Sequence, residues 1–550
     1  MARSILRPRA VHPHKQLAAR CGRLTALIIG VLLLIGSAAQ AAPDTRLAEA
    51  AQRRDMAAVR ALLSQKVDPN APGRDGTSAL LWVVRVDDVA TATQLVKAGA
   101  DVKLANRQGL TPLALAASNG SAAMVKLLLD SGADVNAFDP ANETPLMAVA
   151  RVGNLDAVRV VLEHGATLDA KDPQFEQTAL MVAVRENHPQ VVRLLIELGA
   201  NVNAKTRLGV TPPFILPNSV PGFGHGIGIV RGGSPDRGRR APTPGAMTPL
   251  QYAARDGRLE TVKILLASGA DINQVEANDI TPVLTAITNN HPDVATYLIE
   301  QGADVKKVDW YGRTALFAAV ETRNMDTDNG PPFENSVTRP PYLPLIQLLL
   351  DKGADPNART AEQLPIRNQF LRTTGTLEWV DFTGMTPFIY AARAGDVDAM
   401  KLLLKAGADP KIETFRGTNA LMAAAGVNWV FNQTYWEGEP RNLEAVKLCF
   451  DLGLTDVNKQ NSMGVTALMG AANRGSDEII KYLVSKGAKL DTKDAEGRTA
   501  MTWAEGVFLA TNPAQAKASS IALLTSLAKQ SPQAAAPAPA GAGSGQVASK

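Results

Sequence analysis

The sequence predicts an all-α solenoid of about twelve repeat units, each with two short helices and a hairpin-like finger. Two observations support this. A Gly-Ala step ends nine of the units, and neighbouring steps without an insertion lie about 33 residues apart. Each step follows an apolar stretch with helical spacing and precedes a short polar segment rich in turn residues. Two such short helices cannot bury their own apolar faces, so the repeats must stack on one another.

Residues 111–137, TPLALAASNGSAAMVKLLLDSGADVNA, show the elements of one repeat in order. Thr111 is expected to cap the first helix, because its hydroxyl can accept from an orphan amide, and Pro112 has its φ preset for helix entry. The second helix carries apolar residues such as Leu128 on one face. Gly132 is expected to end that helix in the left-handed conformation, which a side chain disfavours.

The pattern G-x-T-P-L-x-x-A-A-x-x-G, followed by an L-L pair and G-A-D-x-N-A, resembles the ankyrin repeat. The resemblance covers residues 44–530, with residues 47–70 as an N-terminal cap and 497–530 as a C-terminal cap. It implies a helix-turn-helix and finger solenoid that binds proteins on its concave face. The histidine that follows Thr-Pro-Leu in the family is absent throughout, so stacking is expected to depend more on apolar contact.

Residues 1–41 have the features of a secretory signal peptide: six basic residues, no acid, an apolar run over 24–36, and Ala39-Gln40-Ala41. Cleavage after about Ala41 is expected. The alternative is an uncleaved membrane anchor, although the apolar run is short against the roughly 20 residues of a transmembrane helix. We therefore expect an exported protein, in a periplasm rather than outside the cell, because nothing marks passage through a second membrane.

Removal of this leader changes the charge of the chain. The formal net charge is +4, and loss of six basic residues brings it near −2, so nucleic acid is not an expected partner. Only Cys449 remains in the mature chain, which excludes an intramolecular disulfide, and its place in an apolar helix predicts a buried thiol.

Four insertions interrupt the period, and the last residues form a tail. Regular repeats occupy residues 44–206 and 246–310. The glycine-rich segment of the first insertion lacks the spacing of a phosphate-binding loop, and no metal-binding or triad motif occurs, so no cofactor, metal or catalytic residue is predicted. The insertions are a finger insert at 207–245, then 325–343, 360–383 and 428–440, and a tail expected to be disordered covers 531–550.

Two groups of residues are predicted to bind a partner. The position after the paired small residues of the first helix faces the concave groove in ankyrin-like arrays, and arginine occupies it in five repeats. The alternative is an ordinary solvated helix face, since Glu186 and Asp256 adjoin two of these arginines. Ten aromatic residues fall between Phe370 and Trp436, several of them in the insertions, where they either bind a partner or fold back on the array. The predicted partner-binding residues are Arg85, Arg151, Arg185, Arg255, Arg393, Trp379, Phe382, Trp429, Tyr435 and Trp436.

The sequence therefore predicts an exported, non-catalytic scaffold that binds a protein, with an acidic surface if the arginines form the site. Two alternatives remain at this stage. One is a hydrolase or small-ligand-binding protein with a pocket formed by the insertions around units eight to ten. The other is a membrane-tethered scaffold that retains its leader.

Overall fold

The computed structural model describes residues 44–209, 245–324, 341–362, 364, 380–429, 438–506 and 516–530. The expected leader (1–41), most of each insertion and the expected tail (531–550) lie outside these residues, as do Trp379, Tyr435 and Trp436. The chain divides into two compact bodies. The N-terminal body comprises residues 1–116 and 126–134, and the C-terminal body comprises residues 117–125 and 135–550.

The described residues form twelve pairs of short helices, which confirms the predicted all-α repeat architecture. The first three pairs are α2 (Arg46–Gln52) with α3 (Met56–Ser64), α4 (Ala79–Arg85) with α5 (Val89–Lys97), and α6 (Pro112–Asn119) with α7 (Ala122–Asp130). The later pairs are α8 (Pro145–Val152) with α9 (Leu155–Glu163), α10 (Ala179–Arg185) with α11 (Pro189–Glu197), α12 (Pro249–Arg255) with α13 (Leu259–Ala267), α14 (Pro282–Thr288) with α15 (Pro292–Glu300), α16 (Ala315–Arg323) with α17 (Leu343–Asp351), α18 (Pro387–Arg393) with α19 (Val397–Lys405), α20 (Ala420–Ala425) with α21 (Glu439–Asp451), α22 (Ala467–Arg474) with α23 (Asp477–Ser485), and α24 (Ala500–Glu505) with α25 (Ala518–Gln530).

The first helices from α4 to α22 begin at a residue whose side chain accepts from an amide of the first turn, as predicted for Thr111. The hydroxyl of Thr111 accepts from the amide of Ala114 at 3.2 Å, and Thr144 accepts from Met147 at 3.3 Å. Such a bond satisfies one of the amides that a helix start leaves without a partner. Gly132 has a φ of 92°, the left-handed conformation expected at the end of the second helix. The local sequence therefore sets both ends of the helix pair.

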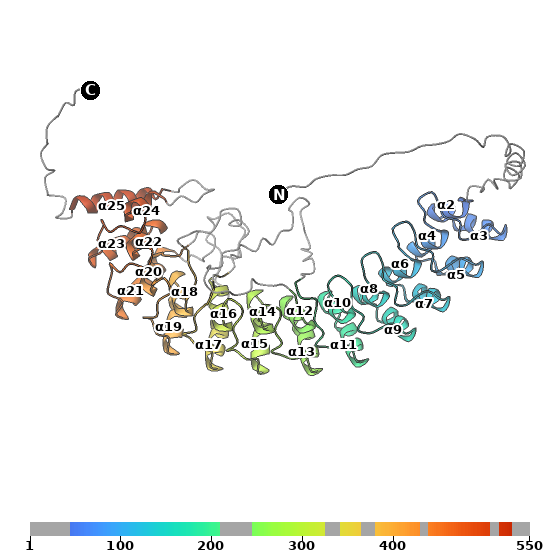
Figure 1. The fold of residues 1–550 in the computed structure, drawn as a ribbon, viewed down its shortest axis with the longest axis horizontal. Helices are drawn as coiled ribbons and strands as arrows, with labels where there is room; N and C mark the ends of the chain where they lie inside the picture. Colours follow the sequence, from blue (N-terminus) through green and yellow to red (C-terminus); the bar gives the residue numbers. More distant parts are fainter. Residues whose placement is uncertain are drawn as a thin grey trace, which may run out of the picture. The chain divides into compact units, whose positions relative to one another are not determined.

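In the C-terminal body the helices stack in two rows (Figure 1). From α8 to α24 each first helix packs on the next first helix, and from α9 to α25 each second helix packs on the next second helix. The first helices are buried almost all round, as in α10, where every residue from Ala179 to Val184 is buried. The second helices bury one stripe, such as Val191, Val192 and Leu195 in α11. In α8, α10 and α12, polar side chains reach solvent mainly at the C-terminal end of the helix.

The fingers are turns closed by side chains, and the described residues contain isolated bridges but no strand. Asp139 shows the pattern: its amide donates to the carbonyl of Glu143 at 2.9 Å, and its carboxylate accepts from the amides of Ala141 and Glu143. Asp side chains satisfy turn amides in this way. The predicted hairpin is therefore a short loop held by its own aspartate.

In five of the described fingers, an asparagine ties the repeat to the turn that ends the next repeat's second helix. Asn203 donates to the carbonyl of Gly269 at 3.1 Å and accepts from the amide of Asp271 at 2.8 Å. Asn357 makes the same two bonds to Gly407 and Asp409, at 3.0 and 2.7 Å. Asparagine suits this position because its amide offers both a donor and an acceptor. We call this pair of bonds the asparagine clasp, and it recurs at Asn70, Asn136 and Asn458.

The histidines at the start of two second helices have a packing role. The Nε2 atom of His188 lies 2.9 Å from the carbonyl oxygen of Arg151, at the end of the preceding repeat's first helix. The His188 ring packs on Gly153 so closely that a Cβ at that glycine would lie 2.3 Å from the ring, and His291 packs on Gly257 in the same way. Cys449 is fully buried, as predicted, and desolvation raises its pKa to about 12.

Candidate partner-binding surface

The five predicted arginines lie at the C-terminal ends of first helices, in α4, α8, α10, α12 and α18. A cation is favoured there, because the last carbonyls of a helix carry partial negative charge. In the N-terminal body, Arg85 is exposed and its guanidinium lies 5.5 Å from the ring centroid of Trp82. The other four belong to the C-terminal body.

Three of those four arginines are paired with acids of their own repeat. Arg151 lies 3.2 Å from Glu143, and Arg185 lies 3.0 Å from Glu186. Arg255 makes a bidentate pair with Asp256, at 2.7 and 3.0 Å. The expected basic stripe is thus a row of ion pairs in these repeats. An acidic partner has to displace a local carboxylate from each of them.

Arg393 does not lie on an exposed stripe, because its side chain is 1% exposed. Its NH1 group donates to the carbonyl of Asn428 at 2.9 Å. The guanidinium lies between two aromatic rings, 4.8 Å from the centroid of Phe382 and 4.5 Å from that of Tyr390. The expectation of a solvated position was wrong for Arg393, since aromatic residues from the preceding finger and its own helix cover it.

A second buried arginine, Arg474 at the end of α22, was missed by sequence reasoning. It is 8% exposed, and it donates to the carbonyls of Ala424 at 2.9 Å and Arg393 at 2.8 Å. Its guanidinium lies 5.5 Å from the ring centroid of Trp429. Burial, together with the smaller effect of the nearby Arg393 charge, lowers the pKa of Arg474 to about 9. The only sequence signal is an arginine one residue beyond the groove position.

The two predicted groups therefore meet at one place. Arg393 from the arginine set, and Phe382 and Trp429 from the aromatic set, surround the same site, and Arg474 completes it. Phe382 is 6% exposed and Trp429 is half-buried. We call these four residues with Tyr390 the arginine-aromatic cluster, and it is built from α18, α22, the finger before α18 and the turn after α20.

Hydrogen bonds around Asn428 hold the frame of this cluster. Its side-chain NH2 donates to the carbonyl of Asp381 at 2.8 Å, and its Oδ1 accepts from the Asp381 amide at 3.2 Å. These two bonds join the turn after α20 to the finger before α18. They fix Phe382, the next residue after Asp381, beside Arg393.

Two buried carboxylates lie in repeat eight, but a cation bridges them. Arg313 donates from Nε to Asp309 at 2.9 Å and from NH1 to Glu321 at 3.0 Å. Desolvation raises the pKa of Asp309, and the nearby guanidinium of Arg313 opposes that shift. Because Arg313 already occupies both carboxylates, this group is an ion-pair network within the finger and α16.

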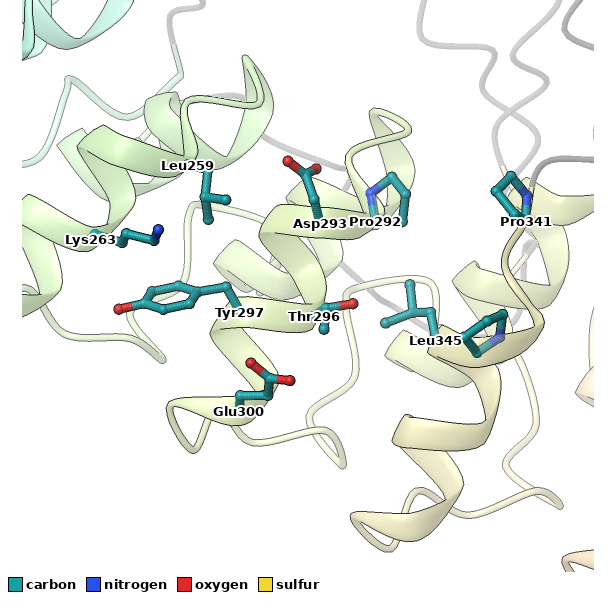
Figure 2. Close-up of a pocket in the computed structure, with 10 residues that line it drawn as sticks. Leu259, Lys263, Pro292, Asp293, Thr296, Tyr297, Glu300, Pro341 and Leu345 are labelled. Atoms are coloured by element: carbon teal, nitrogen blue, oxygen red, sulfur yellow. The ribbon is translucent and has the colours of Figure 1, made fainter.

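A shallow hollow of about 410 Å³ lies on the row of second helices (Figure 2). Leu259 of α13, Tyr297 of α15 and Leu345 of α17 contribute to its lining. The Lys263 ammonium lies 5.6 Å from the centroid of the Tyr297 ring. None of the predicted site residues lines this hollow.

The described residues contain no group of three His, Cys, Asp or Glu side chains placed to hold a metal ion. Every helix in the same part of the chain is too short or too polar to cross a bilayer.

Comparison with known proteins identifies the family. A family model for ankyrin repeats in three copies matches residues 47–139, 138–206, 250–360 and 438–506, and a single ankyrin-repeat model matches 383–415. The chain therefore belongs to the ankyrin-repeat family, whose repeats generally serve as scaffolds for protein–protein interaction.

The matched relatives each align with only part of this chain. Ankyrin repeat protein nuc-2 of Neurospora crassa is 28% identical over 217 residues, which is 36% of this chain and 17% of that protein. Cyclin-dependent kinase 4 inhibitor B of Rattus norvegicus is 38% identical over 119 residues, 22% of this chain and 88% of the relative. The crystal structure of the human ASB11 ankyrin repeat domain aligns with a TM-score of 0.36 and 22% identity, over 51% of this chain and 99% of that one. This chain spans less than half the length of the first curated relatives that it matches.

Proposed function

We propose that this protein is an exported, non-catalytic scaffold that binds a protein partner through its first-helix row and the segments beside α18, α20 and α22. Membership of the ankyrin-repeat family supports the scaffold role. The location of the binding surface is inferred from the arginine-aromatic cluster. Residues from three repeats bring two cations and three aromatic rings together there.

The composition of this cluster suits an interface. Arginine and large aromatic residues dominate the binding energy of protein interfaces, because they combine large contact areas with directional polar groups. The ion pairs at Arg151, Arg185 and Arg255 add polar side chains along the same row, each with 23 to 37% of the arginine side chain exposed. A partner with acidic residues can exchange with the local carboxylates there, at modest cost, since exposed ion pairs contribute only about 0–1 kcal/mol.

Affinity capture from the exported fraction of the native host tests the scaffold role. The wild-type chain is compared with a variant in which Arg151, Arg185 and Arg255 are changed to Glu, and circular dichroism establishes that both are folded. A protein retained by the wild type and lost from the variant supports binding along the first-helix row. If neither chain retains a protein, the scaffold proposal fails.

Export is tested separately. N-terminal sequencing of the protein from cell fractions is expected to give a first residue near Ala42, in the exported fraction. An intact leader on membrane-bound protein supports a tethered scaffold instead, and an intact leader on protein that stays in the cytoplasm contradicts export.

A further inference from the structure

Four arginines in the described part of the C-terminal body are buried, and they fall into two classes. Arg313 lies against Asp309 and Glu321, and Arg323 lies 2.8 Å from Asp396. Arg393 and Arg474, by contrast, have no carboxylate within ion-pair distance in the described part of the chain. Two buried cations without an acid are unusual, because a buried charge is costly unless it is paired.

Backbone carbonyls satisfy only part of these two guanidinium groups. Arg474 donates twice, to Ala424 and Arg393, and Arg393 donates once, to Asn428. A guanidinium has five N–H donors. The Nε atoms of both arginines are buried and have no hydrogen-bond partner. The carbonyls also carry no net charge, so the two positive charges have no counter-ion among the residues that the structure describes.

Aromatic rings give the rest of the environment. Phe382 and Tyr390 lie within 5 Å of the Arg393 guanidinium, and Trp429 lies 5.5 Å from that of Arg474. Ring faces stabilise a cation, but they supply no acceptor for the N–H groups. Trp429 is half-buried, whereas Phe382, Tyr390, Arg393 and Arg474 are buried, so the cluster reaches solvent at Trp429.

We propose that Arg393 and Arg474 form, beside Trp429, a binding site for one carboxylate of the partner protein, which supplies the missing counter-ion. This inference rests on the proposed scaffold function. The two unpaired Nε–H donors equal in number the two oxygens of one carboxylate, and arginine pairs with carboxylates through such directional bonds. The carboxylate comes either from an Asp or Glu side chain or from the partner's C-terminus. The half-buried ring of Trp429 offers a contact to the adjoining residue of the partner, which favours a peptide over a free ion.

Three peptides separate these sources. N-acetyl-Ala-Ala-Glu-Ala-Ala-amide carries only a side-chain carboxylate, N-acetyl-Ala-Ala-Gln-Ala-Ala with a free C-terminus carries only a terminal one, and the amidated Gln peptide carries none. Each is titrated into the purified full chain labelled with nitrogen-15 in arginine. NMR follows the Nε–H signals of Arg393 and Arg474, which are assigned by their loss in the variants.

We expect one or both acidic peptides, and not the amidated Gln peptide, to shift the two Nε–H signals in a saturable way. A response to only one acidic peptide identifies the source of the carboxylate. The shift of the Arg393 signal is expected to disappear in Arg474→Met. It is expected to persist in the matched control Arg441→Met, which removes an arginine from α21 on the other row. No shift with either acidic peptide, or a shift of the Arg393 signal that persists in Arg474→Met, overturns the site.

Lysine variants keep the test valid if a methionine variant does not fold. Arg393→Lys and Arg474→Lys retain the charge but lose the Nε–H donor, so peptide affinity, measured by calorimetry, is expected to fall by at least about tenfold. Affinity equal to that of the wild type contradicts the proposal.

The capture experiment distinguishes failure of the carboxylate site from failure of the scaffold role. A partner retained equally by the wild type and by Arg474→Lys leaves the scaffold function intact and overturns the carboxylate site. Loss of the partner from Arg474→Lys but not from Arg441→Met supports both.

Discussion

The buried ion-pair network of Arg313, Asp309 and Glu321, in the finger and α16, allows a quantitative test of how the array tolerates internal charge. The side chains of Arg313, Asp309 and Glu321 are 4%, 0% and 6% exposed. Changing Arg313 to Met keeps most of the buried volume but removes the cation from two buried carboxylates. Breaking a buried pair in this way typically costs about 3–5 kcal/mol, so we expect a decrease in stability of that size.

The penalty should depend on pH, and the sign follows from the carboxylates. Desolvation raises the pKa of Asp309, and removal of the opposing guanidinium raises it further. Between the unfolded and folded pKa values the folded variant binds more protons than the unfolded chain, so its stability falls as pH rises. The loss relative to the wild type is therefore expected to be larger at pH 8 than at pH 5.

Urea unfolding followed by circular dichroism gives the overall change, and hydrogen exchange of the α16 amides gives the local one. The control Lys126→Met removes an exposed pair with Asp130, and it is expected to change stability by less than about 0.5 kcal/mol. A loss in Arg313→Met below about 1 kcal/mol at pH 8, or an equal loss at pH 5, would refute the reasoning.

Three further predictions concern packing. Leu128→Ala removes a fully buried side chain of α7 and is expected to cost roughly 2–5 kcal/mol in chemical denaturation; a much smaller change would contradict the repeat register. Gly153→Ala and Gly165→Ala both place a side chain at positive φ, but only the first meets a neighbour, the His188 ring, and it should lose roughly 1–3 kcal/mol more. Equal losses would show that the ring moves aside. Native Cys449, buried and with a pKa of about 12, should not react with a thiol reagent at pH 8 until the protein is unfolded in urea, and rapid native labelling would show that α21 is open.

The sequence predicts the helices well because their ends depend on local chemistry. Thr144 and Met147 are three residues apart, and Gly132 ends its helix through its own φ. The burial of Leu128 follows from helical spacing, and it needs no knowledge of the neighbouring repeat beyond its existence. These features are set within a few residues, so one repeat suffices to predict them.

The site could be predicted only in part, because its contacts cross repeats. The position of Arg393 after two alanines indicates a groove-facing side chain, but its burial depends on Phe382 and Asn428, 35 residues away for the latter. Arg474 contacts the carbonyl of Arg393 across 81 residues, and no periodic pattern indicates that bond. The partner-binding role of these residues remains a prediction.

The asparagine clasp forms in the same way whether the chain between two repeats is short or long. Asn136 and Gly165 are separated by 29 residues, whereas Asn203 makes the same bond to Gly269 across 66 and Asn357 to Gly407 across 50. The asparagine bonds to the turn that lies beside it in the stack, whatever the number of residues between them. The entropic cost of closing a longer loop grows only slowly with its length. New sequence can therefore accumulate in the fingers without loss of register. The same positions offer places where a foreign domain can be inserted while the stack on either side keeps its contacts.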